Sequence, residues 1–262
     1  MNNNFYKHYT FMNGLIKDSS VTPLHRELQV EKINFFNHGY MPVKKEVDTP
    51  DSYLKTCSSL YLHLLENELT YNLHSKNILD VGCGRGGGIN TLLHIYKFND
   101  VSACDFNLEN ITFCKQNYNN ISFTQCDALN LQYPSNYFDY VLNVESSHCY
   151  SDLDKFFSEV KRVLNLSGTF LYTDAFTTEK DAITAESKLK NNGFNIKSIE
   201  DITHNVYLSC EYLCNFFTQL NTNTNTNNNQ NNITMFLENL YRFKAGLYKV
   251  RRNVYYVFKA SI

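Results

Sequence analysis

Residues 77–88, Asn-Ile-Leu-Asp-Val-Gly-Cys-Gly-Arg-Gly-Gly-Gly, form the stretch that decides the fold. The apolar run before Asp80 is short and undiluted, which is typical of a central strand buried on both faces of a parallel sheet. The glycines let the backbone approach a ligand closely, and the helix that they open presents its N-terminus to negative charge. Gly82, Gly84 and Gly87 also satisfy G-x-G-x-x-G, the dinucleotide pattern, so this stretch alone leaves an NAD enzyme open.

Short apolar runs alternate with helical patterns along the rest of the chain. The predicted strands are 77–81, 100–104, 121–124, 138–143, 169–173, 194–199 and 254–259. The predicted helices are 51–69, 87–97, 107–118, 152–164, 178–191, 205–220 and 232–248. Strands separated by helices imply parallel pairing through right-handed crossovers. We therefore expect an α/β fold, a Rossmann-like seven-stranded and mostly parallel sheet with helices on both faces.

The length of 262 residues, 43% of them hydrophobic, suits one large α/β domain. We expect an N-terminal helical cover at 1–70, a cofactor-binding core at 77–200, and substrate-side helices with the last strand at 201–262. The cover includes the turn-like stretch 37–42. The asparagine-rich tract 221–232 cannot bury enough apolar area to offset its ordering entropy, so we expect a disordered surface loop there.

The charge balance argues against a nucleic-acid partner. The net charge is -2 and the isoelectric point is about 6.4, whereas a phosphate backbone favours a strongly basic surface. The eight cysteines form neither a C-x-x-C pair nor a Cys/His cluster at zinc spacing, so we expect neither a metal site nor a disulfide framework. The sequence has neither a signal-peptide pattern nor an apolar run near the roughly 20 residues that cross a bilayer, which predicts a cytoplasmic protein.

A basic cluster near the end of the chain has two interpretations. Its members are Arg242, Lys244, Lys249, Arg251 and Arg252. These charges could attract an anionic lipid head group or a membrane surface. A solvated helix face is the more common arrangement, and we adopt that interpretation.

Three carboxylates at strand ends separate two classes of cofactor. Asp105 ends the second strand, 21 residues after Gly84, where a carboxylate can accept hydrogen bonds from two ribose hydroxyls of NAD or of S-adenosylmethionine. Asp80 lies in the glycine motif and is suited to the amino group of a methionine tail, which a dinucleotide lacks. Asp127 follows the third strand and can accept from the adenine amino group. The set favours S-adenosylmethionine.

Four motifs, in this order and spacing, resemble those of the class I S-adenosylmethionine-dependent methyltransferases. They are DVGCGRG (80–86), SACDF (102–106), QCDA (125–128) and FDYVLNVESSHCY (138–150). The resemblance covers about residues 77–207. Within this superfamily, the SSHCY run and the upstream HGYMP segment (38–42) are similar to the phthiotriol/phenolphthiocerol dimycocerosate O-methyltransferases and, more distantly, to natural-product and sugar O-methyltransferases.

This resemblance implies a set of residues that hold S-adenosylmethionine. It assigns Gly82, Cys83, Gly84 and Gly86 to the methionine end, Asp105 to the ribose, and Asp127 with Ala128 to the adenine. Phe106 belongs to the same motif as Asp105, and Asn143 ends the fourth strand beside the methyl donor. Together with Asp80, these residues are the predicted cofactor site.

His148 and Asp174 are the catalytic candidates. They follow the fourth and fifth predicted strands, and the carboxyl ends of parallel strands share one edge of a sheet. Natural-product O-methyltransferases of similar pattern use a histidine after this strand as base, supported by an acid after the next. The candidates for contact with substrate are Tyr40, Glu145, Ser147 and Tyr150. For Glu145 and Ser147, the favoured alternative is that they hold the loop.

The sequence therefore predicts an S-adenosylmethionine-dependent methyltransferase that releases S-adenosylhomocysteine. The predicted acceptor is a hydroxyl on an apolar small molecule, polyketide or lipid, because His148 offers a general base with Asp174 as its support. Two alternatives remain: a carbon or nitrogen methyltransferase of a small molecule, and a noncatalytic S-adenosylmethionine-binding protein. An NAD dehydrogenase is a more distant third alternative. An amine acceptor would need less base, so turnover that survives the loss of His148 would favour it.

Overall fold

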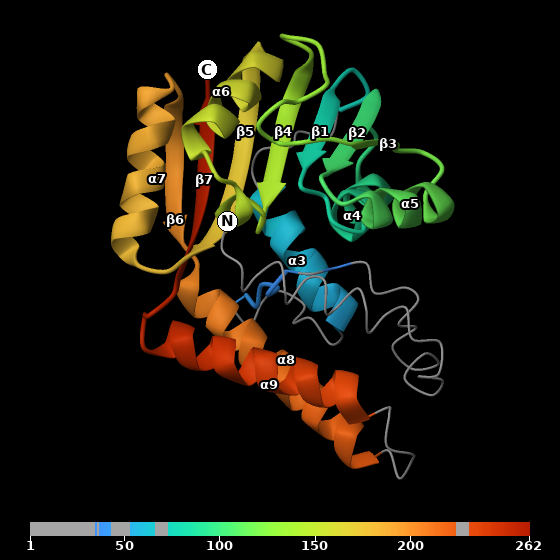
Figure 1. Ribbon diagram of the computed structural model, residues 1–262, viewed down its shortest axis with the longest axis vertical. Helices are drawn as coiled ribbons and strands as arrows, with labels where there is room; N and C mark the ends of the chain where they lie inside the picture. The colour runs from blue at the N-terminus through green and yellow to red at the C-terminus, as the bar shows by residue number, and fades with distance from the viewer. Residues whose placement is uncertain (1–34, 36, 43–52, 66–72, 224–230) are drawn as a thin grey trace.

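The computed structural model describes residues 35, 37–42, 53–65, 73–223 and 231–262 (Figure 1). The strands are β1 (Asn77–Val81), β2 (Asp100–Asp105), β3 (Ser122–Gln125), β4 (Phe138–Val144), β5 (Leu164–Phe176), β6 (Asn195–Asp201) and β7 (Val254–Ser261). The helices are α3 (Tyr53–Leu65), α4 (Gly87–Ile95), α5 (Leu108–Asn117), α6 (Leu153–Val163), α7 (Glu179–Asn191), α8 (Thr203–Asn223) and α9 (Asn231–Lys249), with a 3-10 turn, η2 (Ser147–Cys149).

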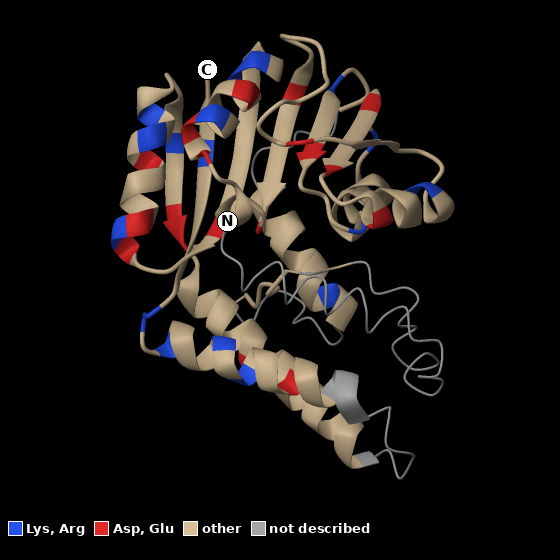
Figure 2. Cartoon of the chain, viewed as in Figure 1, with Lys and Arg blue, Asp and Glu red and all other residues tan. Residues whose placement is uncertain are grey.

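The described strands form one seven-stranded sheet in the order β3-β2-β1-β4-β5-β7-β6. The strands from β3 to β5 pair in parallel, and β7 runs antiparallel to both of its neighbours. The carboxyl ends of the five parallel strands therefore meet at one edge, and Figure 2 shows acidic residues at the tips of β1 and β2 there. The predicted Rossmann-like, mostly parallel sheet is confirmed.

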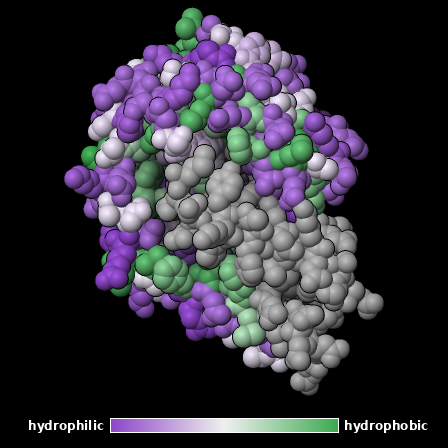
Figure 3. Space-filling model, viewed as in Figure 1, coloured by the Kyte–Doolittle hydropathy of each residue, from purple (hydrophilic) through white to green (hydrophobic). Residues whose placement is uncertain are grey.

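Neighbouring residues of the central strands pack on opposite faces of the sheet, as strand geometry requires. Ile78 and Leu142 belong to a hydrophobic cluster that includes residues of α3, α4, α5, α8 and α9. Leu79 and Val141 belong to a second cluster with α6 and α7. Helices therefore cover both faces, and the visible surface over α6 and α7 in Figure 3 is mostly hydrophilic.

Helix α3 and the α8–α9 hairpin lie beyond the carboxyl ends of the parallel strands (Figure 1). Aromatic rings join these helices: Phe217 of α8 stacks on Tyr241 of α9 with centroids 5.8 Å apart, and its edge meets Tyr53 of α3 at 6.0 Å. The three helices therefore stand over the edge where sheets of this kind bind ligands.

Most element boundaries lie within a few residues of the expectation, and two regions differ in a way that matters for the fold. Strand β5 begins at Leu164 rather than at 169 and ends at Phe176 rather than at 173. Leu164 pairs with Phe138 ahead of a register shift, at which the step from Leu164 to Thr169 in β5 faces the step from Phe138 to Tyr140 in β4, so the additional residues lie in β5. Helix α8 continues to Asn223 and α9 begins at Asn231, so both ends of the predicted loop 221–232 are helical. The side-chain amide of Asn221 donates to Glu238 at 2.7 Å, a contact between the helices that local sequence does not reveal. The rest of that tract, and the predicted cover before residue 35, lie outside the described residues.

Candidate active site

The turn after β1 places three glycines in the left-handed backbone region. The φ angles of Gly82, Gly84 and Gly86 are 76°, 55° and 76°, values that are costly for a residue with a Cβ. The backbone N–H groups of Gly82 and Cys83 donate to the carbonyl oxygen of Cys104 at 2.8 and 3.0 Å. The turn is thus fixed against the carboxyl end of β2.

Asp105 fastens this turn from the end of β2. Its Oδ2 accepts from the Gly84 N–H at 2.9 Å, and its Oδ1 accepts from the Asn107 N–H at 2.9 Å and from Asn110 Nδ2 at 3.2 Å. Burial raises the pKa of Asp105 to about 6, although these hydrogen bonds oppose the rise. A carboxylate offers about four lone-pair sites. Both of the expected ribose hydroxyls could bind only if one of them replaced a protein donor.

Asp80 is a buried carboxylate whose charge is poorly compensated. It is 0% exposed, and neither oxygen makes a hydrogen bond of normal geometry within the described residues. Burial, and next the charge of Asp105, raise the pKa of Asp80 to about 8, with the Tyr61 hydroxyl opposing this rise. A buried acid in this state is costly unless a donor or a cation meets it. An ammonium group, such as that of a methionine tail, would supply both.

Of the two predicted adenine residues, Asp127 is accessible and Ala128 is not. Asp127 is exposed and its Oδ1 accepts from the Leu129 N–H at 2.9 Å, while Ala128 is buried beside it. Phe106 is 60% exposed at the end of β2. A carboxylate and an aromatic ring that solvent can reach are suited to a purine base.

Asn143 and Tyr150 lie against the glycine turn. Asn143 Nδ2 is 2.8 Å from the Val81 carbonyl oxygen, 2.8 Å from Ser146 Oγ and 3.0 Å from the Tyr150 hydroxyl. A Cβ on Gly82 would lie 2.0 Å from Ser146 Oγ. This network joins the ends of β1 and β4 beside the turn. Tyr150 is part of it, and its contact with substrate stays a prediction.

His148 and Asp174 are in direct contact at the ends of β4 and β5. His148 Nδ1 lies 2.6 Å from Asp174 Oδ1. Asp174 is buried, and it also accepts from the backbone N–H groups of His148 and Ala175 at 3.0 and 2.8 Å. The His148 side chain is 29% exposed. The buried acid is thus rigidly held, while the imidazole that it orients reaches solvent.

The charge of His148 depends on Asp174. Burial alone would lower the pKa of His148, but the Asp174 charge and the hydrogen bond between the two outweigh it and raise this pKa well above 6.5. Because Nδ1 faces Asp174, Nε2 is the nitrogen that would exchange a proton with a ligand. The pair with Asp174 therefore favours the imidazolium form of His148.

Ser147 supports the acid rather than pointing at substrate. Its hydroxyl donates to Asp174 Oδ2 at 2.5 Å and lies 2.7 Å from the hydroxyl of Tyr172 in β5, and Ser147 is itself buried. These contacts with Asp174 and Tyr172 are the ones expected if Ser147 holds the loop after β4. As a substrate contact, Ser147 would first have to leave Asp174.

Glu145, which directly follows β4, is the centre of a second polar cluster. Its side chain is 7% exposed. Glu145 Oε1 accepts from the Tyr255 hydroxyl at 2.5 Å and from the His38 backbone N–H at 2.8 Å. His38 Nδ1 lies 3.6 Å from Glu145 Oε2 and 2.9 Å from the Tyr248 hydroxyl. Burial raises the pKa of Glu145 to about 7 and lowers the pKa of His38 well below 6.5.

Three members of this cluster, His38, Tyr248 and Tyr255, are absent from the predicted site. Their contacts join residues 107 to 210 positions apart in the chain, a distance that no local pattern spans. The HGYMP segment is the one signal that marks His38. Tyr40, the predicted substrate residue of that segment, stacks on His63 of α3 with centroids 4.1 Å apart, and its contact with substrate stays a prediction.

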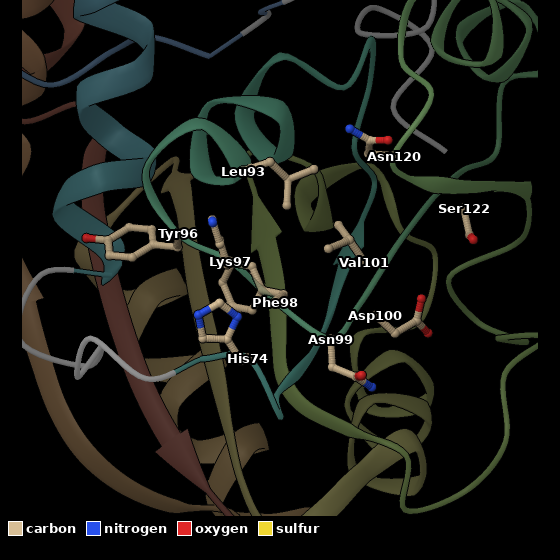
Figure 4. A pocket seen from close by; sticks show the side chains of 10 residues that line it. All are labelled: His74, Leu93, Tyr96, Lys97, Phe98, Asn99, Asp100, Val101, Asn120 and Ser122. Atoms are coloured by element: carbon tan, nitrogen blue, oxygen red, sulfur yellow. The ribbon is translucent and has the colours of Figure 1, made fainter.

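A polar surface hollow of about 380 Å³ lies at the opposite edge of the sheet (Figure 4). Asp100 and Ser122, the first residues of β2 and β3, line it together with His74 and Lys97. It is therefore at the amino ends of the strands, away from the glycine turn.

No group of three or more His, Cys, Asp or Glu in the described part of the chain could hold a metal ion. Of the helices that are described, none is long and apolar enough to cross a membrane.

One edge of the sheet thus carries a glycine turn after β1, acidic residues at the ends of β1 and β2 and after β3, and a histidine after β4 that is paired with an acid near the end of β5. Residues 79–172 match the model of the family described as "Methyltransferase domain". The resemblance seen in the motifs is thus confirmed.

Two curated relatives are similar over part of the chain. A fatty-acid O-methyltransferase of Mycolicibacterium smegmatis is 37% identical over 155 residues, which cover 57% of this chain and 56% of the relative. A protein of Mycobacterium ulcerans, named as a probable phthiotriol/phenolphthiotriol dimycocerosates methyltransferase 2, is 35% identical over 152 residues, 57% of this chain and 58% of its own length. The chain therefore matches little more than half the length of these relatives.

Solved structures share the fold more widely. A Galdieria sulphuraria protein assigned as a sarcosine dimethylglycine methyltransferase superposes with a TM-score of 0.72 over 93% of this chain and 98% of its own, at 14% identity. The cyclase SpnF superposes with a TM-score of 0.65 over 86% of each chain, at 18% identity. Because a cyclase shares it, the fold by itself does not fix the reaction.

Proposed function

We propose that this protein is an S-adenosylmethionine-dependent O-methyltransferase whose acceptor is an oxygen on an apolar, lipid-like molecule. The observation that carries the proposal is the 2.6 Å contact between His148 Nδ1 and the buried Asp174 carboxylate, at the edge of the sheet that also carries the glycine turn. The names of the two curated relatives, a fatty-acid O-methyltransferase and a dimycocerosates methyltransferase, support an apolar acceptor.

The residues on the β1–β3 side fit the cofactor. Asp80 would meet the methionine ammonium, which relieves an otherwise unpaired buried acid. The glycine turn would lie against the methionine end, Asp105 against the ribose, and Asp127 with Ala128 against the adenine. When bound, S-adenosylmethionine supplies a sulfonium-activated methyl group.

The residues on the β4–β5 side would remove the proton of the acceptor hydroxyl. An alcohol becomes an effective nucleophile only as its proton leaves, so neutral His148 would accept that proton at Nε2. Asp174 fixes the ring orientation through Nδ1 and stabilises the imidazolium that forms. Ser147 and two backbone N–H groups hold Asp174 in place, so little reorganisation is needed during transfer.

The test is methyl transfer from labelled S-adenosylmethionine to three chains of equal length that end in a carboxylic acid, a hydroxyl or an amine. We expect label on the oxygen acceptors and a loss of roughly 10²–10⁴-fold in kcat for alcohol methylation in His148→Ala. His94→Ala, which changes an exposed histidine of α4, is the matched control. Label on the amine alone, undiminished in His148→Ala, would point to N-methylation. Binding of S-adenosylhomocysteine without turnover on these chains or on a lipid extract would point to a noncatalytic protein.

A further inference from the structure

Glu145 has a backbone conformation that is unusual for its residue type. Its φ is 48°, in the left-handed region, and its N–H donates to the Thr173 carbonyl oxygen of β5 at 3.0 Å. A residue with a side chain persists there only where its surroundings impose it, and such positions cluster at functional sites. Here the conformation turns the carboxylate into the protein.

The buried carboxylate of Glu145 is held mostly by neutral donors. Among the described residues its ion-pair neighbour is His38, whose pKa burial lowers, and its hydrogen bonds come from the Tyr255 hydroxyl and the His38 N–H. Retaining a buried acid in this way costs stability that an apolar residue would not cost. The cluster therefore calls for a role other than stabilising the fold.

Hydrogen bonds join the segment 37–42, which contains His38, to helices α3 and α8. The Tyr40 N–H donates to the Thr56 carbonyl oxygen of α3 at 3.1 Å, and the Met41 N–H to the Asn205 carbonyl oxygen of α8 at 3.3 Å. The His38 carbonyl oxygen accepts from Ser209 Oγ at 2.7 Å. The bond from the His38 N–H to Glu145 is the link that ties this segment to the catalytic edge of the sheet.

The position of this link separates it from all of the predicted cofactor residues except Asn143 of β4. The glycine turn, Asp105 and Asp127 belong to the β1–β3 half, whereas Glu145 follows β4 and Tyr255 lies on β7, beyond β5 in the sheet. His148 lies three residues after Glu145. The charge of His148 lowers the pKa of His38, although less than burial does, so residues 37–42 are held near the proposed base. In the proposed reaction the acceptor would approach His148 from this side.

We propose that Glu145 is a positioning residue for the acceptor: by holding His38 at the edge of the sheet, it keeps residues 37–42 closed over the acceptor side of His148. The inference rests on the proposed methyl transfer. If residues 37–42 are closed for a smaller fraction of the time, the apparent affinity for the acceptor falls in proportion to that fraction. The affinity for the cofactor, which depends on the β1–β3 half of the site, should not change.

The experiment uses the full chain with Glu145→Gly and Glu145→Gln. Glycine removes the carboxylate while suiting the positive φ, so folding is not compromised by the backbone. We expect the acceptor KM to rise about ten- to a hundredfold in Glu145→Gly, the range for a lost charge-assisted hydrogen bond. We expect a smaller rise in Glu145→Gln, which keeps one acceptor oxygen. kcat and the affinity for S-adenosylhomocysteine should stay within about twofold.

Amide hydrogen exchange, measured with S-adenosylhomocysteine and without acceptor, decides the inference even if the proposed reaction fails. The amides of Tyr40 and Met41, which bond to α3 and α8 rather than to Glu145, should exchange about tenfold faster or more in Glu145→Gly. Asp139→Asn is the matched control for Glu145→Gln, because Asp139 accepts a backbone N–H at the other end of β4. It should change neither these amides nor KM.

Two results would overturn the proposal. Faster exchange at the His38 amide alone would mean that Glu145 only hydrogen-bonds this amide and does not hold residues 37–42 in place. A fall in kcat at constant KM would mean that Glu145 acts on the chemical step.

Discussion

Replacing Asp174 with asparagine should lower the kinetic pKa of methyl transfer to an alcohol. Asparagine keeps the shape of the side chain but removes the negative charge 2.6 Å from His148 Nδ1. Burial, which lowers the pKa of His148, would then be almost unopposed. An opposite charge at such close range shifts a pKa by about 1–3. We therefore expect the half-maximal pH of kcat to fall by about 1–3 in Asp174→Asn.

The direction in which kcat changes with pH follows from the protonation state of His148 that reacts. In the wild type the active base is the neutral imidazole, which becomes dominant only above its raised pKa, so kcat should rise with pH. In Asp174→Asn this rise should occur at lower pH. Even on the plateau, kcat should remain below that of the wild type, because an amide donor opposite Nδ1 favours the tautomer whose Nε2 cannot accept a proton. The loss should not exceed the ~10²–10⁴-fold contributed by general base catalysis.

The assay is kcat against pH for the wild type, Asp174→Asn and the matched control Asp139→Asn, whose carboxylate lies at the amino end of β4. Calorimetry with S-adenosylhomocysteine checks that each variant binds the cofactor product. An unchanged kinetic pKa in a folded Asp174→Asn variant with normal binding would refute the reasoning, because His148 would then owe its charge to other groups.

Three further predictions concern the cofactor side and the acceptor. Asp105→Ala should weaken S-adenosylhomocysteine binding by about 1.5–3 kcal/mol through lost charge-assisted hydrogen bonds, and unchanged calorimetric affinity would remove Asp105 from the site. Asp80→Asn should stabilise the cofactor-free protein by about 2–5 kcal/mol above pH 8. The folded acid has a pKa of about 8 against 3.8 in its unperturbed state, so its ionisation destabilises the fold as pH rises between these values. Denaturant titrations should therefore show a gain that grows with pH, and a constant gain would contradict this cause. Finally, a fatty-acid acceptor is already ionised at neutral pH and needs no base, so its kcat should stay flat or fall as His148 loses its proton, whereas that of an alcohol should rise. Identical pH profiles for the two would argue against His148 as the base.

The parallel half of the fold is predictable from sequence because its strands are buried on both faces. The apolar run before Asp80 has no polar interruption, and the observed strand has the predicted bounds. Strand β5 shows the limit: its first residues are partly exposed and polar, so a reading of apolar runs misses the pairing of Leu164. The insertion of β7 between β5 and β6 is not local information either, since it pairs residues about 80 positions apart.

The candidate site divides in the same way. The pairing of His148 and Asp174 could be predicted, because parallel topology brings the carboxyl ends of adjacent strands to one edge, and the two residues lie shortly after β4 and near the end of β5. His38 and Tyr255 could not, since their approach to Glu145 depends on how the cover and the last strand return to the sheet. Glu145 was a candidate by position, but its buried environment appears only in three dimensions.

The boundary of the family match suggests where acceptor specificity lies. The match ends at residue 172, so it includes the glycine turn, the acids at the ends of β1 to β3 and His148, whereas Asp174 and the cluster partners His38, Tyr248 and Tyr255 fall outside it. Cofactor residues and base therefore belong to the shared part of the architecture. The groups that hold residues 37–42 come from segments outside the matched range. If Glu145 joins these two parts, exchanging residues 37–42 together with α8 and α9 between relatives should change the acceptor only when Tyr255 of β7, the remaining partner of Glu145, is exchanged with them.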